Sequence, residues 1–227
     1  MPQTHLPPVV TIDGPSGAGK GTVTRAVVRA LGWHFLDSGA LYRLTALYCH
    51  RQGVSPDDAD QAAALAAVLP AAFRLEDGAE RVLLDGSDVT AELRSEAIGA
   101  LASRVAALEP VRGALLERQR DFRQAPGLVA DGRDMGTVVF PEAPVKIFLT
   151  ATVEERARRR YNQLKGEGAD VSLASLTEEI AERDRRDASR TTAPLKPAPD
   201  AVHLDTTDVA AADVIEQVLA QVREKLE

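Results

Sequence analysis

The segment that most constrains this chain is the glycine-rich run Gly14-Pro15-Ser16-Gly17-Ala18-Gly19-Lys20-Gly21-Thr22. It follows a short β-branched run at residues 9–12 and precedes a helical pattern that begins at Lys20, which is the context that a Walker A phosphate-binding loop requires. In such a loop the glycines let successive backbone N–H groups point at one phosphate, while the helix N-terminus and Lys20 add positive charge. We therefore expect residues 14–22 to bind nucleotide phosphates, the alternative being a glycine-rich turn without a ligand.

The hydroxyl group that such a loop offers to Mg²⁺ comes one position later than usual, at Thr22, because Gly21 follows Lys20 directly. Thr22 is still a candidate magnesium ligand. This form of the loop resembles that of nucleoside monophosphate kinases more than that of signalling GTPases. None of the five lysines stands in the Asn/Thr-Lys-x-Asp element with which such GTPases select guanine, so a GTPase switch is disfavoured.

Composition bounds the size of the fold and the kind of partner. The 227 residues suffice for one domain with an insertion or for two small domains. The formal net charge is −7, so the chain has no overall positive field that would hold a nucleic-acid polymer by its phosphates. We expect small molecules rather than nucleic acids as partners.

The cysteine count and the first residues bear on the compartment. Cys49 is the single cysteine and cannot by itself form an intrachain disulfide or a zinc site, so we expect a cytoplasmic protein. Residues 1–8 contain no Lys or Arg, and no apolar stretch approaches the roughly 20 residues that a spanning helix needs. We expect neither export nor membrane anchoring.

Five short apolar runs alternate with helical patterns along the chain, at residues 9–12, 33–36, 128–130, 145–149 and 201–204. This alternation predicts an α/β fold of three layers, in which a five-stranded parallel sheet has helices on both faces. Ligands of such sheets bind beyond the carboxyl ends of the strands. The polar residues that follow the runs are therefore the candidate site.

The alternation breaks between about residues 55 and 103. Residues 55–58 cap an alanine-rich helix, and three short antiparallel strands are expected near residues 73–75, 81–84 and 87–89. Turns at Asp77-Gly78 and Asp85-Gly86 would join them. We predict an inserted subdomain at residues 63–102, between a first core part at 1–62 and a second at 103–227.

A basic helix is expected after the capping box that begins at Thr152. Arg156, Arg159 and Arg160 lie on it, and Gly166 and Gly168 follow. A basic helix that ends in glycines suits a mobile cover, and we predict a lid at about residues 156–170. Because these positive charges would repel one another in a closed, empty state, we expect the lid to close when a triphosphate binds.

Two predicted strand ends carry further candidates. Ser38 and Arg43 follow the strand at 33–36, where Ser38 could hydrogen-bond a second phosphate and Arg43 could clamp it, the alternative being a helix cap with a surface arginine. Asp131 follows the strand at 128–130, where a Walker B carboxylate could contact Mg²⁺ or its waters. The alternative for residues 131–134 is an Asp/Arg salt bridge in a loop.

Four segments together resemble the bacterial cytidylate kinase family, namely residues 11–22, 36–43, 130–141 and 144–149. The resemblance spans nearly the whole chain and includes the inserted subdomain, which that family uses to bind the monophosphate. It implies transfer of the γ-phosphoryl group of MgATP to CMP and dCMP by a monomer. ATP and Mg²⁺ are thus the expected cofactors.

The same resemblance assigns roles around the acceptor nucleotide. It places Arg133 at the acceptor phosphate, and Ser103, Arg112 and Asp134 at the cytosine ring. Cytosine presents its N4 amino group as a donor beside the acceptors N3 and O2. A carboxylate such as Asp134, next to donors such as Arg112 and Ser103, is complementary to this pattern. From sequence alone, Ser103 and Arg112 would be read as helix-surface residues.

The charged run at residues 181–190 and the lid complete the implied site. The resemblance places Arg183 and Asp187 at the sugar hydroxyls, Arg190 at the transferring phosphates, and the three lid arginines over ATP. Spacings of four and seven residues put the first three on one helix face. The alternative is a solvated helix face with i,i+4 ion pairs.

Catalysis in this scheme needs no general base, because a nucleotide phosphate is already anionic near neutral pH. Lys20, Arg133, Arg190 and the lid arginines are the candidates for neutralising charge on the moving phosphoryl group. Two other classes stay open from the residues themselves. One is a P-loop kinase for UMP, AMP or another metabolite, and the other is an ATP-dependent binding or regulatory module.

Overall fold

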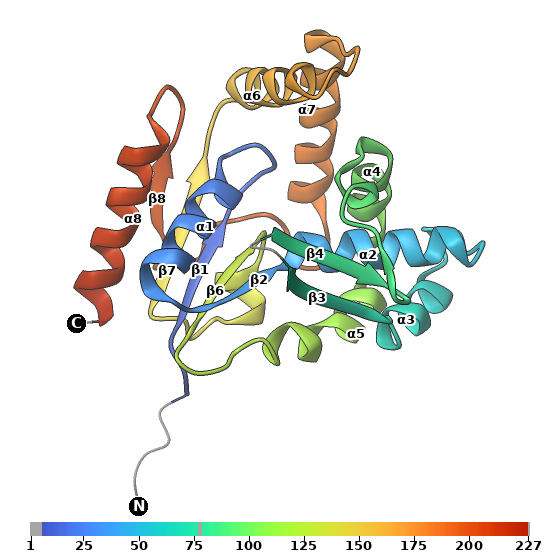
Figure 1. The fold of residues 1–227 in the computed structure, drawn as a ribbon, viewed down its shortest axis with the longest axis horizontal. Coiled ribbons are helices and arrows are strands. Elements are labelled where there is room, and N and C mark those ends of the chain that lie inside the picture. The colour runs from blue at the N-terminus through green and yellow to red at the C-terminus, as the bar shows by residue number, and fades with distance from the viewer. Residues whose placement is uncertain (1–5, 77–78, 227) are drawn as a thin grey trace, which may run out of the picture. The chain divides into compact units, whose positions relative to one another are not determined.

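The computed structural model describes residues 6–76 and 79–226, which form two compact units (Figure 1). One unit contains the residues up to Leu36 together with those from Arg120 onward, and the other is Asp37–Gln119. The predicted turn at Asp77-Gly78 lies outside the described residues.

The first unit is built on a sheet of strand order β2-β6-β1-β7-β8, in which the pairs β1–β6, β1–β7 and β7–β8 are parallel. The strands are β1 Val9–Asp13, β2 His34–Asp37, β6 Leu128–Gly132, β7 Val145–Thr150 and β8 Val202–Asp205. Each contains one of the predicted apolar runs or most of it, and β1 and β6 are buried along their whole length, as continuous apolar runs in a parallel sheet should be. The predicted α/β fold with a five-stranded sheet is confirmed.

The flanking helices of this unit are α1 Lys20–Leu31, α6 Val153–Gly166, α7 Leu173–Ser189 and α8 Ala211–Leu226, and a π-helix spans Met135–Val139. Helices α1 and α8 pack on the sheet through small branched residues such as Val23, Val27, Val214 and Val218. Thr152 caps α6 by accepting from the backbone N–H of Glu155, as the capping box predicts. None of the helices in the described residues is both long and apolar enough to cross a membrane.

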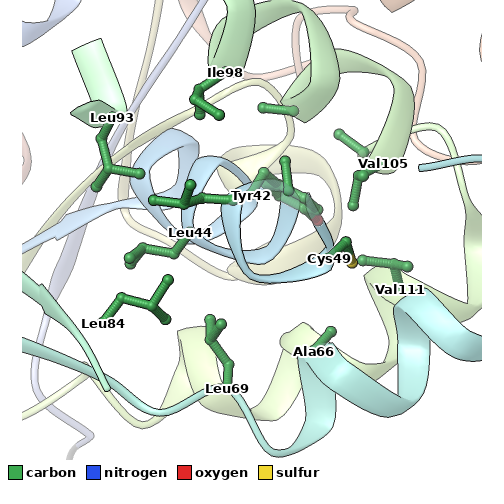
Figure 2. Packing of buried hydrophobic residues seen from close by; sticks show 14 of the residues in the cluster. Tyr42, Leu44, Cys49, Ala66, Leu69, Leu84, Leu93, Ile98, Val105 and Val111 are labelled. Atoms are coloured by element: carbon green, nitrogen blue, oxygen red, sulfur yellow. The ribbon is translucent and has the colours of Figure 1, made fainter. Parts of the chain in front are cut away.

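The second unit has its own core, in which α2 is the central element (Figure 2). Its elements are α2 Ser38–Arg51, α3 Ala59–Ala67, β3 Ala71–Glu76, β4 Ala79–Leu84, β5 Ser87–Asp88, the 3₁₀ helix η1 Glu92–Arg94, α4 Glu96–Val105 and α5 Glu109–Arg120. The three strands are antiparallel, with Phe73 opposite Val82, as the sequence predicts.

The unit is wider than the insertion predicted at residues 63–102. Tyr42, Leu44 and Cys49 of α2 share one apolar cluster with Val105 of α4 and Val111 of α5 (Figure 2). Because the hairpin and α3 bury their apolar side chains in this same cluster, α2 and α5 belong to the unit, which runs from Asp37 to Gln119.

Candidate active site

The phosphate-binding loop lies between β1 and α1, where the sequence predicts it. Gly14 has a φ of 146°, and a Cβ atom there would lie 2.1 Å from the carbonyl oxygen of Leu149 on β7, so no other residue fits at this position. Gly19 precedes α1 directly, and its carbonyl accepts from the N–H groups of Thr22 and Val23. The first turn of α1 is therefore formed, with its N-terminus at the loop.

Lys20 is buried at the start of α1, and its Nζ donates to the carbonyl oxygen of Pro15 at 2.9 Å. The pKa of Lys20 is lowered to about 7, chiefly by burial and in addition by the positive charges of Arg133 and Arg183, while Asp131 opposes the shift. The buried ammonium group is therefore unfavourable by itself, and the negative charge of a bound phosphate would stabilise it.

Asp13, the last residue of β1, was not singled out as a site residue by the sequence. Its side chain is 5% exposed and accepts the backbone N–H groups of Met135 and Gly136 at 2.9 and 2.8 Å. Burial raises the pKa of Asp13 to about 7, although the two backbone hydrogen bonds lower it. The one sequence signal for a site residue here was a carboxylate directly after an apolar strand. The same pattern is equally typical of a residue that begins a turn.

Arg133 and the charged run of α7 meet at one buried carboxylate. Asp187 is only 1% exposed, accepts from Arg133 Nε at 3.2 Å and pairs with Arg190. Burial tends to raise the pKa of Asp187, but the charges of Arg133, Arg190 and Arg183 outweigh it and hold the pKa below its ordinary value. The alternative of a solvated helix face is therefore wrong for Asp187, whereas the exposed pair Glu182–Arg185 fits it.

Two of the predicted helix-face residues lie on α7, and Arg190 follows the end of the helix at Ser189. Arg183 reaches back to the phosphate-binding loop, where its Nη1 lies 3.4 Å from Ser16 Oγ. Arg133 and Arg190 thus meet at Asp187, and Arg183 of the same helix contacts the loop, while the roles of these residues toward a substrate stay a prediction.

Helix α6 is tied to the phosphate-binding loop by two of its three predicted lid arginines. Arg156 is buried, forms a two-pronged ion pair with Asp184 of α7, and donates to the carbonyl oxygen of Ser16 at 3.0 Å. Arg159 bonds Glu155 and Thr206. The expected mutual repulsion of these charges is wrong, because Asp184 and Glu155 compensate them.

Arg160 differs from the other two, since its Nη1 donates to Gln163 one turn along α6. Asp184 and Thr206 are further residues that sequence reasoning did not select. Thr206 is buried and donates from Oγ1 to the carbonyl oxygen of Ala18 at 3.2 Å, so it links the loop to Arg159. Neither residue stands in a recognisable motif.

The predicted residues of the second unit are held by partners within that unit. Asp37, not Ser38, caps α2, with Oδ1 accepting from the N–H of Ala40, so the alternative that Ser38 is the cap is wrong. Ser38 is buried and donates to Gln119 Oε1 at 2.7 Å. Arg43 Nη1 donates to the carbonyl oxygen of Leu93 at 2.6 Å.

Ser103 and Arg112 are both buried, which contradicts the alternative that they lie on a helix surface. The guanidinium carbon of Arg112 lies 5.5 Å from the centre of the Tyr42 ring, and its Nη1 donates to the carbonyl oxygen of Ala106 at 3.1 Å. The predicted cytosine pocket divides between the units, because Asp134, which is 2% exposed, belongs to the other one. Its assembly stays a prediction.

A parallel sheet that ends in a phosphate-binding loop, with a buried lysine and an arginine network beside it, defines a P-loop nucleotide-binding protein of the α/β class. A family model described as cytidylate kinase matches residues 10–224, and the chain belongs to the cytidylate kinase family.

Curated relatives cover nearly the whole chain. The cytidylate kinase of Stutzerimonas stutzeri (strain A1501) is 58% identical over 224 residues, which are 96% of each chain. That of Pseudomonas entomophila (strain L48) is 58% identical over 96% of this chain and 95% of its own. That of Methylococcus capsulatus is 58% identical over 95% of this chain and 97% of its own.

Proposed function

We propose that this protein transfers the γ-phosphoryl group of ATP to CMP and dCMP, giving ADP and the nucleoside diphosphates. The observation that carries the proposal is the family match over residues 10–224, on a chain whose buried Lys20 lies at an intact phosphate-binding loop. Membership in the family supports the reaction, and the buried arginine network beside the loop supports phosphate as the group that is handled.

On the donor side, residues 14–22 would surround the phosphates of ATP with backbone N–H groups, and Lys20 would add a point charge. Thr22 is exposed in the first turn of α1. Asp131 lies on β6 opposite Ile12 of β1, the strand that directly precedes the loop. These two hard oxygen donors suit Mg²⁺, which commonly takes one or two protein ligands and otherwise phosphate and water. Bound there, Mg²⁺ would neutralise charge on the phosphates.

Within the described residues no three acidic, His or Cys side chains gather into a site that could hold a metal unaided. A donor set of Thr22 and Asp131 therefore fits a metal that arrives with the nucleotide. We propose no other metal for this chain.

On the acceptor side, Ser38, Arg43 and Arg133 would bind the phosphate of CMP. Asp134 would accept from the N4 amino group, and Arg112 and Ser103 would donate to the ring acceptors. The burial of all three base-reading residues supports this assignment, because hydrogen-bond readout discriminates most strongly where water is excluded.

Around the transferring group, Arg133 and Arg190 would neutralise charge, and Arg183 and Asp187 would hold the sugar. Asp187 contacts both Arg133 and Arg190 in the structure, so one buried carboxylate orients the two arginines together. Arg156, Arg159 and Arg160 would cover ATP from α6. Positioning and charge neutralisation are sufficient for catalysis without a general base, since the acceptor phosphate is already an anionic nucleophile.

Two further expectations belong to the same proposal. The family resemblance supports a monomer, which sedimentation of the purified protein tests directly. The single cysteine supports a cytoplasmic location.

The experiment that tests the proposal is a coupled assay of ADP release with CMP, dCMP, UMP or AMP as acceptor. We expect CMP to exceed UMP by roughly 10-fold to 100-fold in kcat/KM, because a buried acceptor that faces the O4 of uracil costs about 1 to 3 kcal/mol. Preference for UMP, AMP or another metabolite would favour the alternative kinase. ATP binding without turnover would favour the binding or regulatory module.

Lys20→Ala supplies the inactive control for this assay. It removes the side-chain charge of the phosphate-binding loop but keeps the backbone donors, so turnover should fall by at least about two orders of magnitude while CMP still binds. Lys225→Ala is the matched substitution, since Lys225 is exposed near the end of α8, and should leave turnover unchanged. Loss of CMP affinity in Lys20→Ala with turnover retained would mean that the two nucleotide sites are assigned the wrong way round.

A further inference from the structure

The carboxylate of Asp13 lies between two segments to which the proposed function gives different substrates. Asp13 ends β1 and directly precedes the phosphate-binding loop. Its Oδ1 accepts the N–H of Met135 at 2.9 Å and its Oδ2 accepts the N–H of Gly136 at 2.8 Å. Both oxygens of one buried side chain are therefore used on two consecutive backbone groups, which follow Arg133 and Asp134 directly.

The segment that Asp13 holds, residues 132–136, is packed closely against the sheet. In the β1–β6 register Asp13 lies opposite Gly132, at the start of this segment. A Cβ atom at Gly136 would lie 2.9 Å from Thr11 Oγ1 and 3.2 Å from Lys146 Cδ, so the backbone of residue 136 touches β1 and β7. The segment is thus fixed by β1 at Thr11 through packing and at Asp13 through hydrogen bonds.

The bond to Met135 acts directly on Asp134. The N–H of Met135 and the carbonyl of Asp134 belong to one planar peptide group, so fixing that N–H fixes the plane on the C-terminal side of the Asp134 Cα. The hydrogen bond to Asp13 therefore restrains the backbone from which the buried Asp134 side chain extends.

We propose that Asp13 is a positioning residue for acceptor selection, which sets Asp134, and with it Arg133, at the geometry that the acceptor nucleotide requires. The inference rests on the proposed function, because it takes Asp134 as the reader of cytosine. A carboxylate suits the task, since it offers two acceptors to two parallel donors. An asparagine keeps the shape but turns an N–H₂ group toward a backbone N–H, so one of the two bonds is lost.

The test is the ratio of kcat/KM for CMP to kcat/KM for UMP at saturating ATP in Asp13→Asn. A defect confined to the donor loop or to overall stability lowers both values together and leaves the ratio unchanged, whereas a displaced Asp134 lowers the ratio. We expect the ratio to fall at least about fivefold, in keeping with the loss that a small misplacement of a substrate-binding group causes.

Thr11→Val is the matched control on the same strand. Thr11 Oγ1 is buried against the same glycine and makes no hydrogen bond within the described residues, and valine has nearly the same shape. We expect this variant to keep the CMP-to-UMP ratio within about twofold of the wild type.

Amide hydrogen exchange gives a readout that does not depend on turnover. The amides of Met135 and Gly136 should exchange faster in Asp13→Asn than in the wild type and Thr11→Val, while the amides of β6 stay protected. Faster exchange at these two amides with an unchanged CMP-to-UMP ratio would overturn the inference, because Asp13 would then hold the segment without affecting selection.

Two further results would also decide the matter. If Asp13→Asn and Asp13→Ser both fail to fold, Asp13 serves the fold and not acceptor selection, and the inference is overturned. A wild-type protein that prefers UMP or AMP to CMP would instead overturn the proposed function, and this result is seen before any variant is compared.

Discussion

Lys20 and Asp13 both carry an ionisable group into the interior of the first unit. Burial lowers the pKa of Lys20 to about 7 and raises that of Asp13 to about 7, so each group is close to losing its charge at neutral pH. Attraction between them opposes both shifts. A nucleotide phosphate bound at the loop would add negative charge next to Lys20 and would therefore favour the charged form of the lysine.

The shift at Asp13 predicts how stability depends on pH. The pKa rises from 3.8 to about 7 on folding, so the folded protein holds this proton more tightly than the unfolded chain does. Stability contributed by Asp13 is therefore complete at low pH and is lost as pH rises toward 7. Relative to Asp13→Asn, the wild type should lose about 2 kcal/mol of unfolding free energy between pH 5 and pH 8.

Urea unfolding of both proteins across that pH range measures the difference. Subtracting the variant removes the contributions of the shared titrating groups that do not interact with Asp13, and leaves that of Asp13 together with its coupling to Lys20. A difference that stays constant with pH would show that Asp13 is ionised throughout the range and that its raised pKa is wrong.

Residues inside a motif could be predicted from the sequence, and residues outside one could not. The loop at 14–22 and Lys20 were predicted because their spacing alone defines a backbone conformation. Asp13 was missed because its partners, Met135 and Gly136, are more than 120 positions away in the sequence. A hydrogen bond between a side chain and a distant backbone group leaves no periodicity to detect.

At the scale of elements, α6 and α7 act on the phosphate-binding loop together. Arg156 of α6 holds Asp184 of α7 and the carbonyl of Ser16, and Arg183 of α7 reaches the hydroxyl of the same Ser16. Any movement of α6 away from the loop must break or exchange the Arg156 bonds. A triphosphate offers oxygen acceptors that could replace the backbone carbonyl.

Hydrogen exchange over residues 152–170 tests this lid assignment. We expect a non-hydrolysable ATP analogue to slow exchange there, because phosphate oxygens would hold the arginines more tightly than a backbone carbonyl does. Helix α8, Ala211–Leu226, is the internal control, because it contains none of the proposed site residues, and its exchange should not change. Exchange at 152–170 that is indifferent to the analogue would contradict the lid.

Strands and caps were predictable because they depend on local sequence. The five apolar runs became the five strands of the main sheet, and the capping box at Thr152 begins α6. The π-helix Met135–Val139 was not predicted, since its Thr-Val-Val sequence has no helical preference. Tertiary bonds explain it better, because Asp13 holds the first two residues of this helix.

At the scale of the whole molecule, the chain is two units with separate cores. The hairpin made the second unit visible in the sequence, but its full extent of Asp37–Gln119 was not visible. Helix α2 reads as an ordinary helix of the alternating pattern, and only the structure shows that its apolar residues form the centre of the second core (Figure 2).

We propose that the buried carboxylate of Asp134 selects cytosine by accepting from its N4 amino group. The most direct test is kcat/KM for CMP and for UMP in the wild type and in Asp134→Asn. Asparagine supplies both an acceptor and a donor and can turn to suit either base, so the CMP-to-UMP ratio should shrink by roughly 10-fold or more.

Activity with CMP should account for most of that loss, and activity with UMP should be kept or raised. Asp121→Asn, an exposed substitution of the same kind in the same unit, should leave both values unchanged. If Asp134→Asn lowers the stability of the protein but leaves the CMP-to-UMP ratio as it is in the wild type, Asp134 has a structural role and the account of base selection is contradicted.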